Sequence, residues 1–455
     1  MAGGGLTTPP AQIAGGFLRG KALIYPLSLV ISLFFLWGFS YGLLDVLNKH
    51  FQTVLGITKL ESTGLQVVYF GGGYLLFSPV AAEVMKRWGY RPTILMGLSL
   101  YSLGAIMFWP TAHFSNPANP TAAFGGFVAC TFIIACGLAT LETSANSYAV
   151  VIGNPASASA RLQFCQSWNG FFFSGENANS LVNVQFVYLA VACAGAAIGV
   201  LFFFAKLPEV SKVVLATQTV ADNPAADEFA AEVGAGPLYK QYNMIFAFIA
   251  QFCYVGAQVT IASFFINYAS ESGGFSDAEG SNMLSYALIT FTVGRFAATA
   301  LATVFQADFL LMVYASVAIA MNAYVASAHG AAGVGVLIAI FFFEAPMYPT
   351  IFTLGTANLG RHTERAAGIL VMGVSGGAVF TPIQGAIADQ FGTRISYLVP
   401  LFGFIYVLGY VTIHWLRHGR HIMRVKEVVS VGAAAAEHTS EDDKKAEAVA
   451  VERRL

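Results

Sequence analysis

Two acidic residues lie inside long apolar runs, where acids are rare. Asp45 falls in the run at residues 23–47, and Glu142 falls in the run at residues 124–151. Each run exceeds the length of about 20 residues that a membrane-spanning helix needs. An ionised carboxylate at the centre of such a helix costs about 2.5 kcal/mol or more, so it normally faces a polar cavity or a partner. The two acids therefore predict proton handling on a path through a membrane.

Aromatic residues share a helix face with the first acid. Trp37, Tyr41 and Asp45 recur at i, i+4 and i+8, which places them on one side of a helix. An aromatic face packs on the C–H groups of a sugar, and a carboxylate accepts hydrogen bonds from its hydroxyls. The alternatives are helix packing or interfacial anchoring for Trp37 and Tyr41, and an exposed mouth position for Asp45.

The second acid has an amide one helical turn away. Glu142 and Asn146 are i, i+4 neighbours. A carboxyl group in an apolar cavity holds its proton more readily than one in water, because burial disfavours the charged form. Such a group releases the proton when water reaches it, so Glu142 is the candidate proton carrier. The alternative is a structural ion pair with Arg161 or Arg295.

The second half of the chain carries a polar stripe. Gln251, Tyr254 and Gln258 fall at i, i+3 and i+7 in an apolar run without an acid. Buried amides need hydrogen-bond partners, and sugar hydroxyls or neighbouring helices can supply them. The stripe predicts a binding surface in this half. Glu344 and Arg295 are further charges in apolar runs, and we expect them to pair with each other or to gate rather than to contact substrate.

Composition places these residues in a membrane protein. Of 455 residues, 56% are hydrophobic and only 10% are charged, whereas about 25% are charged in soluble domains. Apolar blocks of this length are typical of spanning helices, and a net charge of −1 indicates no nucleic-acid partner. The five cysteines are expected to be buried small side chains without disulfides. No metal-ligand cluster, nucleotide loop or nucleophile–base motif is found, so neither a metal, a cofactor nor an enzyme is predicted.

Eleven apolar runs are clear and a twelfth is weak. The weak one is at residues 162–173, and the clear ones are near residues 23–47, 64–84, 92–110, 124–151, 184–205, 243–269, 281–304, 308–328, 331–357, 366–388 and 395–416. Five regions are predicted on this basis: a cytoplasmic N-tail at 1–22, a six-helix half at 23–205, a charged cytoplasmic loop at 206–241, a second six-helix half at 242–418, and a disordered cytoplasmic tail at 419–455.

Basic loops set the expected orientation. Basic residues lie near Lys86, near Arg361 and in the tail from Arg417 onward. All three groups reach the cytoplasm only if the N-terminus is inside and the number of spans is twelve.

The two halves resemble each other. Leu141-Glu142-Thr-Ser-Ala-Asn146 precedes Gly153, and Phe343-Glu344-Ala-Pro-Met-Tyr348 precedes Gly355, with eleven residues from Glu to Gly in both. Two six-helix repeats around a central charged loop are typical of major facilitator transporters, which bind substrate between the halves near the membrane midplane.

Several motifs together resemble the fucose:proton symporter family of the major facilitator superfamily, over about residues 25–418. They are Phe34-Phe-Leu-Trp-Gly-Phe39 with Asp45, Gly64-Leu-Gln with Met85-Lys-Arg-Trp-Gly-Tyr90, Leu141-Glu-Thr-Ser-Ala-Asn146, Arg161-Leu-Gln-Phe-Cys-Gln-Ser-Trp-Asn169, Gln251-Phe-Cys-Tyr-Val-Gly-Ala-Gln258, Gly294-Arg-Phe296 and Tyr348-Pro-Thr-Ile-Phe352. The resemblance implies sugar and proton transport by alternating access. It implies that Asp45 takes part in substrate binding and proton coupling, that Glu142 carries the proton, and that Gln166 contacts sugar. Tyr348 of the last motif and Asn146 join the candidate sugar contacts.

The chain departs from the family at two places. Tyr41-Gly-Leu-Leu44 stands where fucose permeases have asparagines before the acid, so the identity of the sugar stays open. The fifth run, at residues 162–173, would form a helix of only about 18 Å in a hydrocarbon core of about 30 Å. We expect that roughly a dozen residues are missing from this helix, which leaves a short, tilted or partly unwound span.

The sequence therefore predicts an all-α major facilitator fold with a truncated fifth helix. The expected function is proton-coupled symport of a monosaccharide such as L-fucose or a related hexose, by a monomer in the plasma membrane with both termini in the cytoplasm. The alternatives are a proton-independent sugar uniporter, a non-transporting sugar sensor, or an inactive truncated product.

Overall fold

The structure is a computed structural model of the whole chain. It describes residues 18, 20–37, 64–114, 120–154, 157–168, 181–205, 207–208, 237–359 and 362–424. Within these residues the secondary structure is helical, apart from an isolated bridge between Phe305 and Met423. Tyr41, Asp45, most of the predicted central loop and the tail beyond Arg424 lie outside the described residues, so predictions about them stay predictions.

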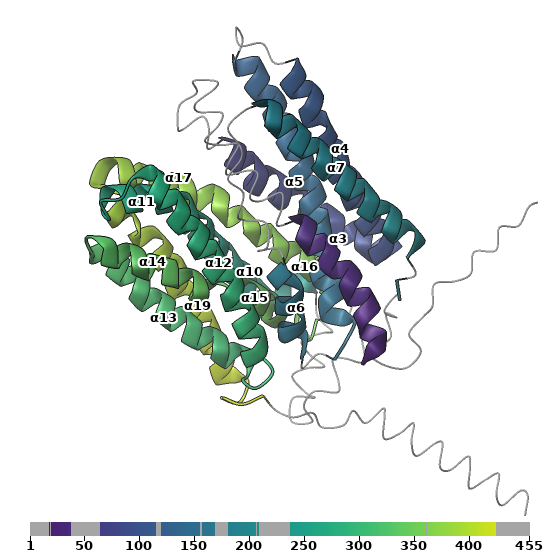
Figure 1. Cartoon of the computed structure of the whole chain (residues 1–455). Coiled ribbons are helices and arrows are strands. Elements are labelled where there is room, and N and C mark those ends of the chain that lie inside the picture. The colour runs from purple at the N-terminus through teal and green to yellow at the C-terminus, as the bar shows by residue number, and fades with distance from the viewer. Residues whose placement is uncertain are drawn as a thin grey trace, which may run out of the picture.

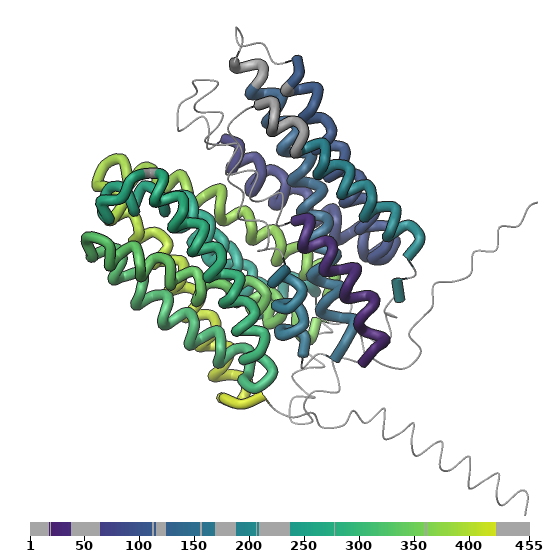
Figure 2. The backbone as a smooth tube through the Cα atoms, in the orientation of Figure 1, coloured from purple at the N-terminus to yellow at the C-terminus, as the bar shows by residue number. Residues whose placement is uncertain are grey.

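The first half groups the N-terminal elements, which run from purple to teal in Figure 1 and Figure 2. After the helix Lys21–Trp37 come a π-helical stretch, η1, and five helices. Their bounds are η1 Val67–Leu75, α3 Leu76–Trp88, α4 Tyr90–His113, α5 Pro120–Val151, α6 Ala158–Ser167 and α7 Leu181–Phe204. Within the group, α4 packs between α5 and α7.

The second half groups the C-terminal elements, from green to yellow. Its bounds are η4 Leu238–Lys240, α10 Tyr242–Ser263, α11 Phe265–Glu271, α12 Asp277–Leu301, α13 Ala307–Ser327, α14 Ala331–Glu344, α15 Met347–Thr356, α16 Thr363–Met372, η6 Gly373–Ser375, α17 Gly376–Phe391, α18 Thr393–Ser396 and α19 Leu398–Arg417. Here α10 packs against α17 and α19, and α13 packs against α14 and α19.

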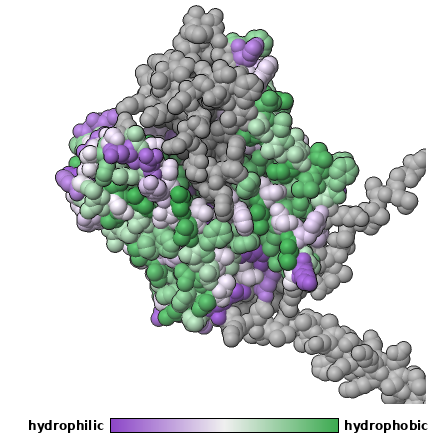
Figure 3. Space-filling model, viewed as in Figure 1, coloured by the Kyte–Doolittle hydropathy of each residue, from purple (hydrophilic) through white to green (hydrophobic). Residues whose placement is uncertain are grey.

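The helices form a multi-pass membrane protein. Nine helices among the described residues are long and apolar enough to cross a membrane, and the helices Lys21–Trp37 and Tyr188–Phe204 are shorter apolar segments. These two groups account for all eleven clear apolar runs. Large hydrophobic side chains such as Phe203, Ile289 and Phe402 are exposed on the flanks, and the green surface in Figure 3 shows this apolar character. A lipid-facing helix keeps every backbone hydrogen bond within itself, which explains why these runs are helical.

The twelfth segment is the short helix α6. It spans ten residues, Ala158–Ser167, or about 15 Å at 1.5 Å per residue. It begins four residues before the predicted apolar stretch, because that prediction followed hydrophobicity and missed the small residues of its first turn. Residues 169–180 lie outside the described part of the chain. That the fifth helix is short therefore stays a prediction.

Small residues allow close helix crossings. A side chain at Gly137 would place its Cβ 2.5 Å from the backbone nitrogen of Tyr101, so α4 and α5 approach closely only because glycine is there. Gly72 and Gly73 of η1 lie against Phe132 and Ala135 of α5. Gly72 and Gly73 are thus positions where η1 packs closely against α5.

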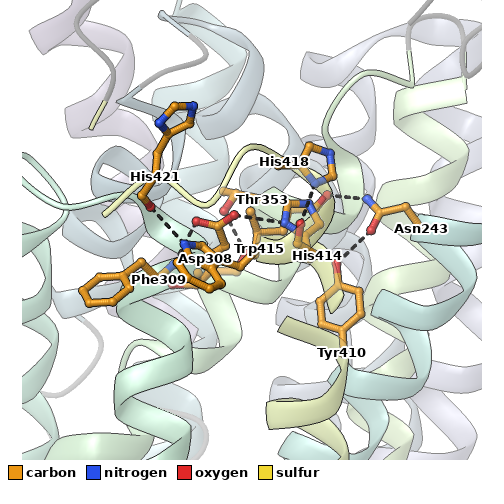
Figure 4. A network of polar contacts seen from close by, with 11 residues as sticks. Asn243, Asp308, Phe309, Thr353, Tyr410, His414, Trp415, His418 and His421 are labelled. Carbon is orange, nitrogen blue, oxygen red and sulfur yellow. Dashed lines mark hydrogen bonds and ion pairs between the residues drawn. The ribbon is translucent and has the colours of Figure 1, made fainter. Parts of the chain in front are cut away.

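Four helices of the second half meet in a polar network at one end of the bundle (Figure 4). The Nδ1 atom of His414 on α19 lies 3.3 Å from Oδ2 of Asp308 on α13. The hydroxyl of Tyr410 donates to Oδ1 of Asn243 on α10, and the amide nitrogen of Asn243 donates to the carbonyl of Leu354 on α15. The network fixes the ends of α10, α13, α15 and α19 relative to one another.

Candidate functional site

A cavity lies between the two halves. The first half lines it with Phe34, Trp37, Phe70, Glu142 and Gln166. The second half contributes several aliphatic side chains and, on its polar and aromatic side, Gln258, Phe291, Arg295, Phe341, Glu344 and Tyr348. An apolar, aromatic wall with a few polar groups suits a molecule that has both C–H faces and hydroxyls.

Glu142 lies in the middle of α5, in the wall from the first half. Its side chain is 7% exposed, and Tyr348, Tyr74 and Asn146 lie next to its carboxyl group. Its Oε2 atom has no hydrogen-bond partner among the described residues. Arg295 interacts with it electrostatically across the cavity. Glu142 is therefore a buried carboxyl group surrounded by hydroxyl and amide groups rather than one closed off by an ion pair.

Arg161, one of the two imagined partners of Glu142, is engaged elsewhere. Its guanidinium donates to the carbonyls of Ala149, Val150 and Asn154 at distances of 2.5, 2.6 and 3.1 Å. These carbonyls belong to the end of α5 and the loop that follows it. The structure thus excludes a direct Arg161–Glu142 pair.

A chain of amide hydrogen bonds joins the halves beside Glu142. The Nε2 atom of Gln166 on α6 donates to Oδ1 of Asn146 at 2.9 Å, and Nδ2 of Asn146 is 3.4 Å from the hydroxyl of Tyr348 on α15. Nη1 of Arg295 on α12 donates to the carbonyl of Gln166 at 2.7 Å. Asn146 is fully buried and positions Gln166 and Tyr348, which line the cavity, although it does not line the cavity itself.

Trp37 lies at the cavity with its ring nitrogen already bound. Its Nε1 atom donates to the hydroxyl of Tyr74 at 2.9 Å, so the polar atom of the ring has a partner within the protein. Phe34, one turn earlier on the same helix, lines the cavity as well. The predicted partners of Trp37 on this face, Tyr41 and Asp45, lie outside the described residues.

Only one residue of the predicted polar stripe on α10 lines the cavity. Gln258 lines the cavity, whereas Tyr254 and Gln251 are fully buried and do not. The hydroxyl of Tyr254 donates to the backbone carbonyl of Glu344 at 2.9 Å. Gln251 packs against Gly373, and neither atom of its amide has a partner among the described residues.

Arg295 and Glu344 both line the cavity, which sequence reasoning did not assign to them. They were expected to pair or to gate, yet no hydrogen bond reaches either carboxyl oxygen of Glu344 within the described residues. The signal that could have placed Glu344 is the internal repeat, because Glu344 matches Glu142 in position and both acids face the same cavity from opposite halves. For Arg295, the position depends on the contact of α12 with α6, which no local pattern reveals.

Comparisons with known proteins agree with this architecture. The family model described as Major Facilitator Superfamily matches residues 30–382. The L-fucose-proton symporter of Escherichia coli (strain K12) is 30% identical over 407 residues, which cover 82% of this chain and 89% of that protein. The glucose/galactose transporter of Brucella abortus biovar 1 (strain 9-941) is 28% identical over 404 residues, which cover 85% of this chain and 93% of that protein.

A solved structure also matches. The crystal structure of the major facilitator transporter FucP in the outward conformation is 30% identical, covers 86% of this chain and 98% of its own, and superposes with a TM-score of 0.71. The predicted all-α major facilitator fold is confirmed. The chain therefore belongs to the major facilitator superfamily and, within it, to the family of the L-fucose-proton symporters.

Proposed function

We propose that this protein is a proton-coupled symporter of a monosaccharide such as L-fucose or a related hexose. The observation that carries the proposal is the cavity between the halves, which combines a buried carboxyl group at Glu142 with aromatic and amide side chains. The relatives support it, because their names are L-fucose-proton symporter and glucose/galactose transporter.

The proposed roles follow from position. Glu142 carries the proton. Trp37 offers its ring face to the sugar, and Gln166, Gln258 and Tyr348 offer hydrogen bonds. Asn146, Tyr254 and Gln251 act from the layer behind the wall, the first through its contacts with Gln166 and Tyr348. Tyr41 and Asp45 keep the roles predicted for them, sugar binding and, for Asp45, proton coupling.

The coupling follows from electrostatics. A buried carboxylate that is not closed off by a direct ion pair opposes closure of the cavity, because the closed cavity removes the water that solvates it. Protonation of Glu142 removes that charge, and sugar supplies hydrogen-bond partners to the amides. The loaded carrier can then rock between its two states, whereas the carrier with only one ligand cannot. Release of the proton inside resets the cycle. The proposed setting is the plasma membrane, with a monomer whose termini both face the cytoplasm.

Uptake into proteoliposomes tests this function. We expect radiolabelled L-fucose, D-galactose or D-glucose to accumulate when an inward proton gradient is imposed. Glu142→Gln should abolish accumulation yet keep exchange of labelled for unlabelled sugar, because the amide mimics the protonated acid. Asp389→Asn is the control, since Asp389 is an exposed acid on α17 away from the cavity lining.

Each other outcome assigns another function. Full accumulation by Glu142→Gln would remove the proton role of this residue. Uptake by the unaltered protein that ignores the gradient would indicate a uniporter. Sugar binding without any uptake would indicate a sensor or an inactive carrier, which the ten-residue α6 makes physically reasonable.

A further inference from the structure

Glu344 lies at a break in the tenth membrane segment. It is the last residue of α14, and α15 begins at Met347 after a turn that contains Pro346. Proline cannot donate the backbone hydrogen bond that would continue the helix. The interruption is a local one, because Ala345 and Pro346 keep helical backbone angles. It lies beside the cavity, which Glu344 lines.

The backbone of Glu344 is held firmly, but its side chain is not. Tyr254 on α10 donates to its carbonyl at 2.9 Å, and Gly294 on α12 packs against Phe342, two residues before Glu344. The side chain is 0% exposed and lines the cavity. Both carboxyl oxygens lack a hydrogen-bond partner within the described residues. A fixed backbone thus presents an unsatisfied acid to the cavity.

Arg295 offsets the charge of Glu344 without satisfying its hydrogen bonds. The guanidinium is close enough for an electrostatic interaction, but its Nη1 atom donates to the carbonyl of Gln166 on α6. Buried polar atoms in folded proteins nearly always have partners, and an orphaned one costs stability. A structural role does not account for an acid that would be more stable as an apolar residue of similar size. No described residue supplies the missing donors, whereas the hydroxyl groups of a bound sugar would.

We infer that Glu344 accepts hydrogen bonds from hydroxyl groups of the transported sugar and determines which sugars the cavity takes. The inference rests on the proposed function and adds a specificity-determining residue to it. Glu142 and Glu344 are two acids against one guanidinium among the described lining residues. With Glu142 protonated in the loaded carrier, Glu344 balances this guanidinium, so the cavity should favour neutral sugars over sugar acids, whose carboxylate would lack a counter-charge.

The test removes the acceptor oxygens of Glu344 by mutation and the donor hydroxyls of the sugar by the use of deoxy analogues. Glu344→Met keeps the volume and removes both acceptor oxygens, while Glu344→Gln keeps one. For the panel sugar that the unaltered protein takes up, we expect Glu344→Met to raise the half-saturating concentration about tenfold to hundredfold, and Glu344→Gln to raise it less. Sugar analogues that each lack one hydroxyl should identify the hydroxyl that Glu344 binds. Removal of this hydroxyl should lower the affinity of the unaltered protein but not that of Glu344→Met.

Stability separates this role from a structural one. Removal of an unpartnered buried acid should leave the thermal unfolding midpoint in detergent unchanged or higher, even as sugar binding weakens. A lower midpoint together with equal losses for every deoxy analogue would overturn the inference. So would unaltered sugar affinity with a changed dependence on the proton gradient, which would make Glu344 a proton site. If the unaltered protein takes up no sugar of the panel, both the inference and the proposed function fail. If it takes up a sugar and the two Glu344 variants take up that sugar with the same half-saturating concentration, the inference alone fails.

Discussion

Arg161 donates hydrogen bonds to several backbone carbonyls that have no partner within their own helix. Its side chain is 7% exposed and forms no ion pair among the described residues. It donates instead to carbonyls at the end of α5, where the last turn of a helix leaves its acceptors without partners. A cation at a helix C-terminus also interacts favourably with the helix dipole. Arg161 therefore joins the start of α6 to the end of α5, the helix that carries Glu142.

Arg161→Met should destabilise the protein strongly. Several carbonyls would lose their donor in a segment that water does not reach, which is expected to lower stability by roughly 3 kcal/mol. We expect a thermal unfolding midpoint several degrees lower in detergent, with partial recovery in Arg161→Lys because lysine has fewer donors in a less rigid arrangement. Arg87→Met is the control, since the Arg87 side chain is 69% exposed. Equal midpoints for Arg161→Met and Arg87→Met would contradict the capping role.

At the level of the element, the end of α19 carries a histidine cluster (Figure 4). The rings of His414 and His418 stack with centroids 3.9 Å apart, and Nδ1 of His418 lies 2.8 Å from the carbonyl of His414. Burial, and next the neighbouring His414, lower the pKa of His418 below its ordinary value. Arg417 acts in the same direction, and Asp308 on α13 opposes it.

The lowered pKa of His418 predicts the direction of a pH effect. Above a pH of about 6.5 the ring is neutral in folded and unfolded chains alike. Below it the unfolded chain binds a proton that the folded protein resists, so stability falls as the pH falls. His418→Asn should flatten the decline of the unfolding midpoint between pH 7 and pH 5. A steeper decline in His418→Asn would refute the assigned direction.

The elements themselves were largely predictable from sequence. A run of about 20 apolar residues can satisfy its backbone in lipid only as a helix, so all eleven clear runs correspond to described helices. Helix α6 was the difficult case, because a short segment with Arg161, Gln163 and Gln166 has little hydrophobic signal. Its existence followed from the even number of spans that the basic loops require, but its first residue did not.

The site was predictable only where a local pattern pointed to it. Glu142 stood out as an acid in an apolar run, and it lines the cavity. Gln251 and Gln258 share a helix face, yet only Gln258 reaches the cavity, because the choice depends on how α10 is rotated against η6 and α17. That rotation is set by packing between distant segments, as when Gly373 leaves room for Gln251. A single sequence carries no direct record of such contacts.

At the level of the whole molecule, the two halves are joined by an ion pair and a close helix crossing. Nε and Nη2 of Arg365, just inside α16, donate to Oε2 of Glu83 on α3 at 3.0 and 2.9 Å. A side chain at Gly368 would place its Cβ 2.5 Å from Ala82, so α16 and α3 pack closely beside the pair. Alternating access requires these contacts to part, so their strength biases the equilibrium between the two states.

Glu83→Gln should shift that equilibrium towards separation at this end, which we propose faces the cytoplasm. The pair is partly exposed, with 43% and 33% of the two side chains accessible, so its contribution is small and the expected shift is about twofold to fivefold. Spin labels on cysteines at the exposed positions Trp88 and Tyr239 would report the distance between the halves, after the exposed Cys193 is replaced by serine.

Arg87→Gln is the matched control for this shift. Arg87 binds the same carboxylate through Oε1 at 3.0 Å, but both residues belong to α3. Its removal deletes a charge from the same site while the link between the halves stays. We expect the distance distribution of Arg87→Gln to match that of the unaltered protein, and the exchange Glu83→Arg with Arg365→Glu to recover part of the closed population. A shift of equal size in Arg87→Gln would mean that local charge, rather than the contact between the halves, sets the balance of states.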